Sequence, residues 1–149
     1  MKEDVKILIA EDDDGHYSLI EKNLKRVGIN NEIVRFADGQ ETLDYLFKED
    51  GGAREASQAY LLLLDINMPK VDGVEVLRKV KEDPELSRIP VIMLTTSDDD
   101  EKTQQCRDLG CTAYIVKPVE YDNFVATIGS IGLFLSVVIM PEIEKVGGN

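Results

Sequence analysis

The chain has 149 residues, of which 43% are hydrophobic and 31% are charged, and its formal net charge is −12. This composition predicts one globular domain and excludes a disordered or membrane-spanning chain. A surface this acidic repels nucleic acid, so we expect no direct binding to DNA or RNA. Residues 1–14 carry acids on both sides of a short apolar stretch and show no signal-peptide pattern, which favours a cytoplasmic protein.

Short apolar stretches rich in Val, Ile and Leu alternate with helical patterns along the chain. Such stretches are typical of buried parallel strands. We expect strands at residues 5–10, 32–36, 60–64, 89–94 and 113–116, each followed by a helix. The signals that start or end these helices are Gly28, Asp38-Gly39, Asp72-Gly73, Asp83-Pro84, Ser97 or Asp98, Gly110 and Glu120.

The alternation of strands and helices predicts an α/β fold, a doubly wound five-stranded parallel sheet with five helices. Right-handed crossovers leave few topologies, and the flavodoxin-like strand order 2-1-3-4-5 is the natural one. We assign residues 1–135 to this domain and residues 136–149 to a C-terminal extension, and we expect no output domain.

Polar side chains follow four of the predicted strands, at the point where each strand ends. They are Glu11-Asp12, Asp65, Thr95 and Lys117. Because open α/β sheets place their sites beyond the carboxyl ends of the strands, we expect these side chains to converge on one edge. Three acids, a hydroxyl and an amine in one place suit a phosphorylatable aspartate beside a divalent cation.

The acidic residues have competing explanations. Asp13 and Asp14 suit a helix start, where carboxylates accept hydrogen bonds from free N–H groups. Glu11 and Asp12 abut the apolar strand, where crowded carboxylates repel one another unless a cation such as Mg²⁺ joins them. Asp65 is either a turn or cap residue, or a nucleophile that forms an acyl phosphate.

Two other kinds of side chain are interpreted as non-catalytic. His16 stands in a polar segment at a helix start, which favours a surface or capping role over that of a phosphate carrier. Cys106 and Cys111 lack the further ligands that a zinc site needs, so we expect reduced thiols.

Motifs at five separated places share one register: Glu11-Asp12 after ILIA, Asp65 in LLLLDINMPKVDG, Thr95 in IPVIMLTT, Tyr114 in AYIVKP, and Lys117-Pro118. In this order the chain resembles a receiver domain of the two-component response regulator family, over about residues 5–130. The resemblance implies a stand-alone signalling protein rather than an enzyme. Such a protein accepts a phosphoryl group from a sensor histidine kinase and switches conformation to signal to protein partners. Its own chemistry is limited to Mg²⁺-dependent self-phosphorylation and autodephosphorylation.

The resemblance also implies which residues hold the cation and the phosphoryl group. Asp65 would be the phosphoacceptor. Asp12 would bind Mg²⁺ directly and Glu11 through water, with Asp65 and the carbonyl of Asn67 as further ligands. Glu11 stands where Asp is the most frequent residue of the family, which lengthens one arm on the metal side.

The remaining motif residues are implied to take part in the switch. Thr95 would reach the phosphoryl group, and Tyr114 would move inward with it. Lys117 would pair with the phosphoryl oxygens, and its bond to Pro118 would be cis. Thr96 stands where a small Ala is usual, which alters access to the acyl phosphate.

Two segments exceed the minimal alternation, a polar loop at residues 48–59 and the tail beyond about residue 133, which overlaps an apolar stretch at residues 131–140. Together they resemble the stand-alone regulators that serve bacterial phytochrome kinases. The apolar stretch is too short to span a bilayer, which takes about 20 residues. We expect a homodimer through the last helix, with Phe134, Val137 and Val138 in the interface. The alternative is a tail folded back on its own domain.

Two further functions compete with the receiver. A haloacid-dehalogenase-like phosphatase also uses a strand-end Asp, Mg²⁺, Thr and Lys, but it needs a second acid two residues after the nucleophile. That position is Asn67, which cannot act as a general acid. A nucleotide or flavin carrier needs a Gly- or Ser/Thr-rich phosphate cradle after the first strand, and this chain has acids there.

Overall fold

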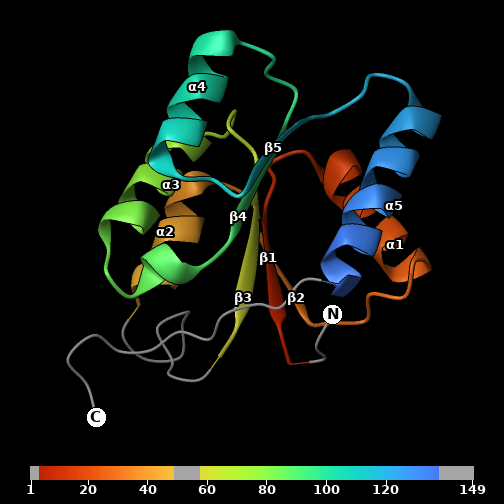
Figure 1. Ribbon diagram of the computed structural model, residues 1–149, viewed down its shortest axis with the longest axis horizontal. Helices are drawn as coiled ribbons and strands as arrows, with labels where there is room; N and C mark the ends of the chain where they lie inside the picture. The colour runs from red at the N-terminus through yellow and green to blue at the C-terminus, as the bar shows by residue number, and fades with distance from the viewer. Residues whose placement is uncertain (1–3, 49–57, 138–149) are drawn as a thin grey trace.

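The computed structural model describes residues 4–48 and 58–137, in which parallel strands alternate with helices (Figure 1). The strands are β1 (Lys6–Ala10), β2 (Ile33–Phe36), β3 (Tyr60–Leu64), β4 (Val91–Thr95) and β5 (Ala113–Val116). The helices are α1 (Asp14–Arg26), α2 (Gly39–Phe47), α3 (Gly73–Glu82), α4 (Asp100–Leu109) and α5 (Tyr121–Val137), with a 3₁₀ turn, η1 (Leu86–Arg88). The sheet order is β2-β1-β3-β4-β5, which confirms the predicted fold class.

The sheet separates two apolar layers. Ile7 and Ile9 of β1 face α1 and α5, whereas Leu8 and Ala10 face the layer formed by α2, α3 and α4 (Figure 1). The three central strands β1, β3 and β4 are buried on both faces, which explains their nearly continuous apolar sequences, whereas the edge strands β2 and β5 are mostly half-buried. Within the described part of the chain, no helix combines the length and the apolar character needed to cross a membrane.

Among the predicted boundaries that differ from the structure, two differ for clear local reasons. β4 begins at Val91 rather than at residue 89, because Ile89 still donates its N–H to Leu86 of the 3₁₀ turn, at 3.0 Å. Pro90 has no N–H to give to the sheet. The N-cap of α4 is Asp99, and neither Ser97 nor Asp98 is the cap. The Asp99 Oδ1 accepts from the backbone N–H groups of Glu101 at 2.8 Å and Lys102 at 3.2 Å.

Strand register brings the polar strand ends together. Ala10 of β1 lies opposite Leu64 of β3, so the residues that follow, Glu11 and Asp65, leave the sheet side by side. Thr95 of β4 lies opposite Val116 of β5, which places Lys117 just beyond the end of β5. The expected convergence on one sheet edge is thus present in the backbone.

Gly73 allows α3 to begin against the turn that follows β3. Its N–H donates to the Ile66 carbonyl at 2.8 Å. A Cβ added there would lie 2.0 Å from the Asp65 carbonyl oxygen, a backbone atom with no room to move aside. A glycine is therefore required at this position, because any side chain would push the Asp65 turn away from α3.

We expect Gly73→Ala to lower the free energy of unfolding by roughly 1–3 kcal/mol, the usual cost of overpacking. The control is Gly129→Ala in α5, whose added Cβ would lie 3.9 Å from its nearest neighbour. That variant should be as stable as wild type or gain up to about 1 kcal/mol, because Ala favours the helix. Urea denaturation measures both, and equal stability of the two variants would contradict this account of Gly73.

Candidate functional site

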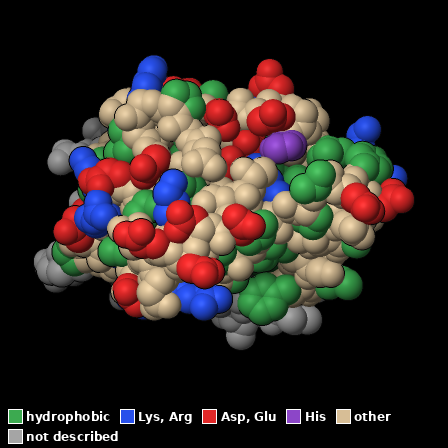
Figure 2. All heavy atoms as spheres, turned by 90° about the horizontal axis from the view of Figure 1, so that it is seen from above, with side chains coloured by type: hydrophobic (Ala, Val, Ile, Leu, Met, Phe, Trp, Pro, Cys, Tyr) green, Lys and Arg blue, Asp and Glu red, His purple; other side chains and the backbone are tan. Residues whose placement is uncertain are grey.

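The predicted acids meet at the carboxyl edge of the sheet. Glu11, Asp12 and Asp65 each offer a carboxylate oxygen, and these oxygens lie within 4.8 Å of one another. Glu11 is only 2% exposed and Asp65 6%, whereas Asp12 is open to solvent. Acidic side chains also gather beside the histidine on the face seen in Figure 2. Three oxygen donors this close form a site suited to a divalent cation.

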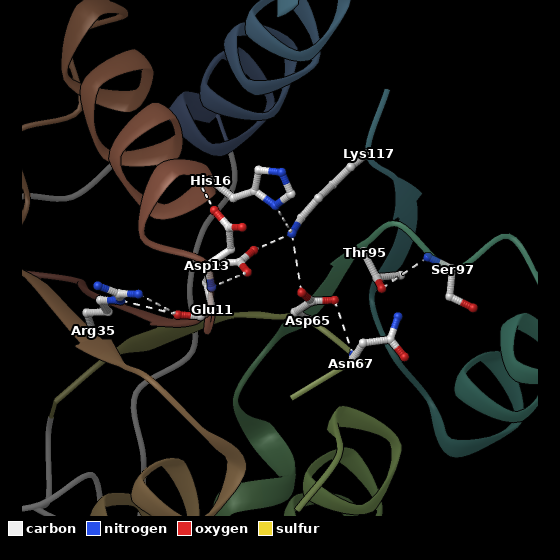
Figure 3. A network of polar contacts seen from close by, with 9 residues as sticks. All are labelled: Glu11, Asp13, His16, Arg35, Asp65, Asn67, Thr95, Ser97 and Lys117. Carbon is white, nitrogen blue, oxygen red and sulfur yellow. Dashed lines mark hydrogen bonds and ion pairs between the residues drawn. The ribbon is translucent and has the colours of Figure 1, made fainter. Parts of the chain in front are cut away.

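Lys117 joins this cluster from the end of β5, and it is 4% exposed. Its Nζ contacts the Glu11 carboxylate directly and lies 3.3 Å from Asp65 Oδ2 (Figure 3). The same Nζ lies 3.2 Å from Nδ1 of His16. The Lys117 ammonium therefore contacts Glu11 just after β1, Asp65 just after β3, and His16 in α1. The first two contacts agree with the predicted convergence of the strand ends.

The carboxyl group of Glu11 has a raised pKa. Burial raises its pKa from the usual 4.5 to about 7, and the neighbouring Asp65 adds to that rise, although the contact with Lys117 opposes it. The loss of hydration thus destabilises the ionised Glu11 carboxylate by more than its interaction with the Lys117 ammonium stabilises it. Additional positive charge at the cluster would stabilise the ionised form.

Arg35 of β2 holds the acidic turn from the other side. Its Nε and Nη2 donate to the Glu11 carbonyl at 3.2 and 3.0 Å, and its Nη1 pairs with Asp14 at 2.8 Å. The guanidinium also lies 4.6 Å from the centre of the Tyr17 ring. Sequence reasoning missed this residue, and its only signal was an arginine within the short apolar strand β2.

The Thr95 side of the site forms a chain of hydrogen bonds. Thr95 is fully buried, and its Oγ1 accepts from the Ser97 N–H at 3.3 Å. The Tyr114 hydroxyl donates to the Ser97 carbonyl at 2.8 Å. Asn67 borders Asp65 through its N–H, which donates to Asp65 Oδ1 at 3.4 Å. The structure thus places Asn67 beside Asp65 and links Tyr114 to Thr95 through Ser97.

Two expectations about this region need correction. The Lys117–Pro118 bond is trans, since the described residues contain no cis peptide bond; the trans isomer is ordinarily favoured before proline by about 0.5–1 kcal/mol. His16 is more than a surface or capping residue, because its ring reaches Lys117 and packs against Phe124, with ring centres 5.7 Å apart. Sequence reasoning missed this contact, because it joins residues that lie 101 positions apart in the chain.

The residues expected in an interface are only partly described. Phe134 is 49% exposed and borders an apolar hollow of about 340 Å³ between β5 and α5. The Val137 side chain and the whole of Val138 lie outside the described residues.

Comparison with known proteins agrees with this geometry. A model of the response regulator receiver domain matches residues 7–129. A receiver domain from Rhodospirillum rubrum is 49% identical, with 94% of this chain and 99% of that chain covered and a TM-score of 0.89. The phosphorylated cyanobacterial phytochrome response regulator RcpA is 36% identical, with 91% and 97% covered and a TM-score of 0.83. The Mn²⁺-bound form of Rcp1, a response regulator of Synechocystis sp., is 31% identical, with 91% and 98% covered and a TM-score of 0.83.

The chain belongs to the response regulator receiver domain family. It is therefore a phosphoacceptor signalling protein, and the phosphatase alternative is not supported. The acidic cluster is the part of the fold suited to a divalent cation.

The raised pKa of Glu11 predicts a pH dependence of stability for the metal-free protein. Because the folded protein binds a proton more tightly than the unfolded chain, this stabilisation is fully present below pH 4.5 and lost as pH rises through about 7. Between these limits the free energy of unfolding should fall by up to roughly 3 kcal/mol more in wild type than in Glu11→Gln. Urea titrations in the presence of a chelator measure the difference, and parallel pH profiles would contradict it.

Proposed function

We propose that Asp65 is the aspartate that accepts the phosphoryl group. The single observation that carries this role is the position of its carboxylate, nearly buried between two other acids and the ammonium of Lys117. An Asp65 oxygen would attack phosphorus while the bond from phosphorus to the donor breaks, and the electron pair would leave with the donor atom. The product is an aspartyl phosphate, and attack by water would return the free carboxylate.

We propose Mg²⁺ as the cation, held by Glu11, Asp12, Asp65 and the carbonyl of Asn67. The donor set fits this ion, because close oxygen ligands of which one is open to solvent suit a hard cation that keeps part of its water. The bound ion would supply positive charge opposite the phosphoryl oxygens. Arg35 contributes by fixing the Glu11 carbonyl, so the carboxylates do not have to be gathered when the ion arrives.

Lys117 and Thr95 are proposed to contact the phosphoryl oxygens, and Tyr114 to follow Thr95. The shared neighbour of Thr95 and Tyr114 supports this coupling, because both hydrogen-bond to Ser97. A Thr95 hydroxyl that turns toward Asp65 would give up the Ser97 N–H. The turn before α4 would then lose the contact that holds it, and the Tyr114 hydroxyl would lose its fixed acceptor.

We propose a sensor histidine kinase as the phosphoryl donor, of the phytochrome class by similarity to RcpA. Such kinases draw on ATP, so the proposed location is the cytoplasm. Residues 1–135 are proposed to form the receiver unit, an extent supported by the family match to residues 7–129. Residues 136–149 remain proposed as an extension of that unit.

We expect Asp65→Asn to abolish phosphoryl uptake from acetyl phosphate in the presence of Mg²⁺, because an amide cannot form the acyl phosphate. Intact mass spectrometry measures the added mass. Asp122→Asn, an exposed acid in the first turn of α5, is the matched control and should gain the mass as wild type does. Phosphoryl mass on the Asp65→Asn protein would show that another residue is the acceptor.

We also propose a two-fold homodimer through α5 and the neighbouring edge strand β5. Leu133 and Phe134 are 66% and 49% exposed, and the apolar hollow beside Phe134 is lined by residues of both elements. Because each copy carries strong negative charge, an apolar contact would have to hold the pair together. Such a contact should persist in added salt.

We expect Phe134→Asp to weaken this dimer by at least about tenfold, the scale of losing roughly 1.4 kcal/mol at an interface. Light scattering over a concentration series measures the association. Phe47→Asp on α2, which changes a partly exposed Phe on the other layer, controls for the added charge. A wild-type protein that stays monomeric with and without a phosphoryl group would rule out the dimer.

A further inference from the structure

The ammonium of Lys117 has three N–H donors, and the structure provides three acceptors for them. They are the Glu11 carboxylate, Asp65 Oδ2 at 3.3 Å and His16 Nδ1 at 3.2 Å (Figure 3). Lys117 is almost fully buried, so water has little room to replace a lost partner. Each of the three contacts therefore helps to fix the position of Nζ.

The three acceptors differ in what else they attract. The carboxylates of Glu11 and Asp65 belong to the acidic cluster, so a divalent cation would compete with Lys117 for them. An imidazole nitrogen is a poor ligand for a hard cation that prefers oxygen. His16 also adds no negative charge that would repel an incoming phosphoryl group. Its contact with Lys117 is thus the one that a cation leaves intact.

His16 is itself held from two sides. Its backbone N–H donates to Oδ1 of Asp13, the N-cap of α1, at 2.8 Å, which fixes the main chain at this position. Its ring packs on Phe124 of α5 at an angle of 31° between the planes. Because an ammonium can only donate, Nδ1 must be the unprotonated nitrogen, and the ring proton must lie on Nε2.

We infer that His16 is a positioning residue, which keeps the Lys117 ammonium at the site while a cation and a phosphoryl group occupy the carboxylates. The inference rests on the proposed role of Asp65 and extends it. The contact needs a hydrogen-bond acceptor and not an aromatic ring, so these two properties of the His16 side chain can be tested separately by substitution.

Two variants separate them. His16→Phe keeps a ring to pack on Phe124 and loses the acceptor, whereas His16→Asn loses the ring and keeps an acceptor oxygen near the place of Nδ1. With Mg²⁺ present, we expect the phosphoryl mimic beryllofluoride to bind about fivefold more weakly to His16→Phe, the scale of one ordinary hydrogen bond. His16→Asn should bind it within about twofold of wild type. Titration calorimetry measures both, and equal weakening in the two variants would overturn the inference.

The test of the proposed function runs alongside. Mass gain from acetyl phosphate in wild type, and none in Asp65→Asn, upholds the phosphoacceptor role whatever the His16 variants do. If wild type gains the mass and His16→Phe binds beryllofluoride as wild type does, only the role of His16 fails. If wild type gains no mass, the proposed function fails and the inference falls with it.

Nitrogen-15 NMR of the one histidine provides a readout that a purely structural role would not move. At alkaline pH we expect an unprotonated Nδ1, with a resonance that shifts in Lys117→Met because its donor is lost. A protonated Nδ1, or a resonance that is unchanged in Lys117→Met, would overturn the inference.

Discussion

The carboxyl edge of the sheet holds three carboxylates against one ammonium, and this imbalance of charge governs the site. Glu11 and Asp65 are buried, so water cannot screen their repulsion, and burial raises the pKa of Glu11 to about 7. Lys117 offsets part of the excess. The remainder can be relieved by a proton or by a cation, so the same geometry that makes Glu11 hold a proton makes the site receptive to a divalent ion.

The surrounding backbone prevents the carboxylates from relieving their repulsion by moving apart. The register of β1 with β3 fixes the starting points of both acidic turns. Arg35 holds the carbonyl of Glu11, and Gly73 lets α3 begin directly against the carbonyl of Asp65. Such preorganisation costs stability in the empty protein, but no reorganisation is then needed when charge arrives at the site. The repulsion between the carboxylates therefore persists in the folded protein, because the backbone around them is fixed.

The sequence predicted the parts of this arrangement that depend on periodicity and chain order. Buried parallel strands have a distinctive composition, and their carboxyl ends share one edge, so Glu11, Asp65, Thr95 and Lys117 could be brought together without coordinates. The two residues that the sequence analysis missed, Arg35 and His16, do not follow from strand periodicity or from the position of a strand end. Arg35 acts from within a strand through its long side chain, and the contact between His16 and Lys117 depends on side-chain direction across the first helix.

The helix starts show the same limit at a smaller scale. Ser97, Asp98 and Asp99 directly precede α4, and each is a residue type that can cap a helix. Asp99 is the cap because only its side chain accepts from the first N–H groups of the helix in the structure. The choice depends on where β4 ends and how the following turn runs, which is a matter of tertiary packing. The existence of the helix can thus be predicted from the local sequence, whereas the position of its first residue depends on tertiary packing.

The edge strand β5 connects the charged cluster to both layers of the protein. Its end carries Lys117, and Tyr114 packs toward the α4 side through Ser97. Ala113 and Ile115 face the opposite layer, where they line the hollow beside Phe134. Because neighbouring residues of a strand point to opposite faces, a shift of this one strand alters both surfaces together. On the proposed role of Asp65, a change of charge at one edge of the sheet would therefore reach both α4 and the proposed dimer surface through β5.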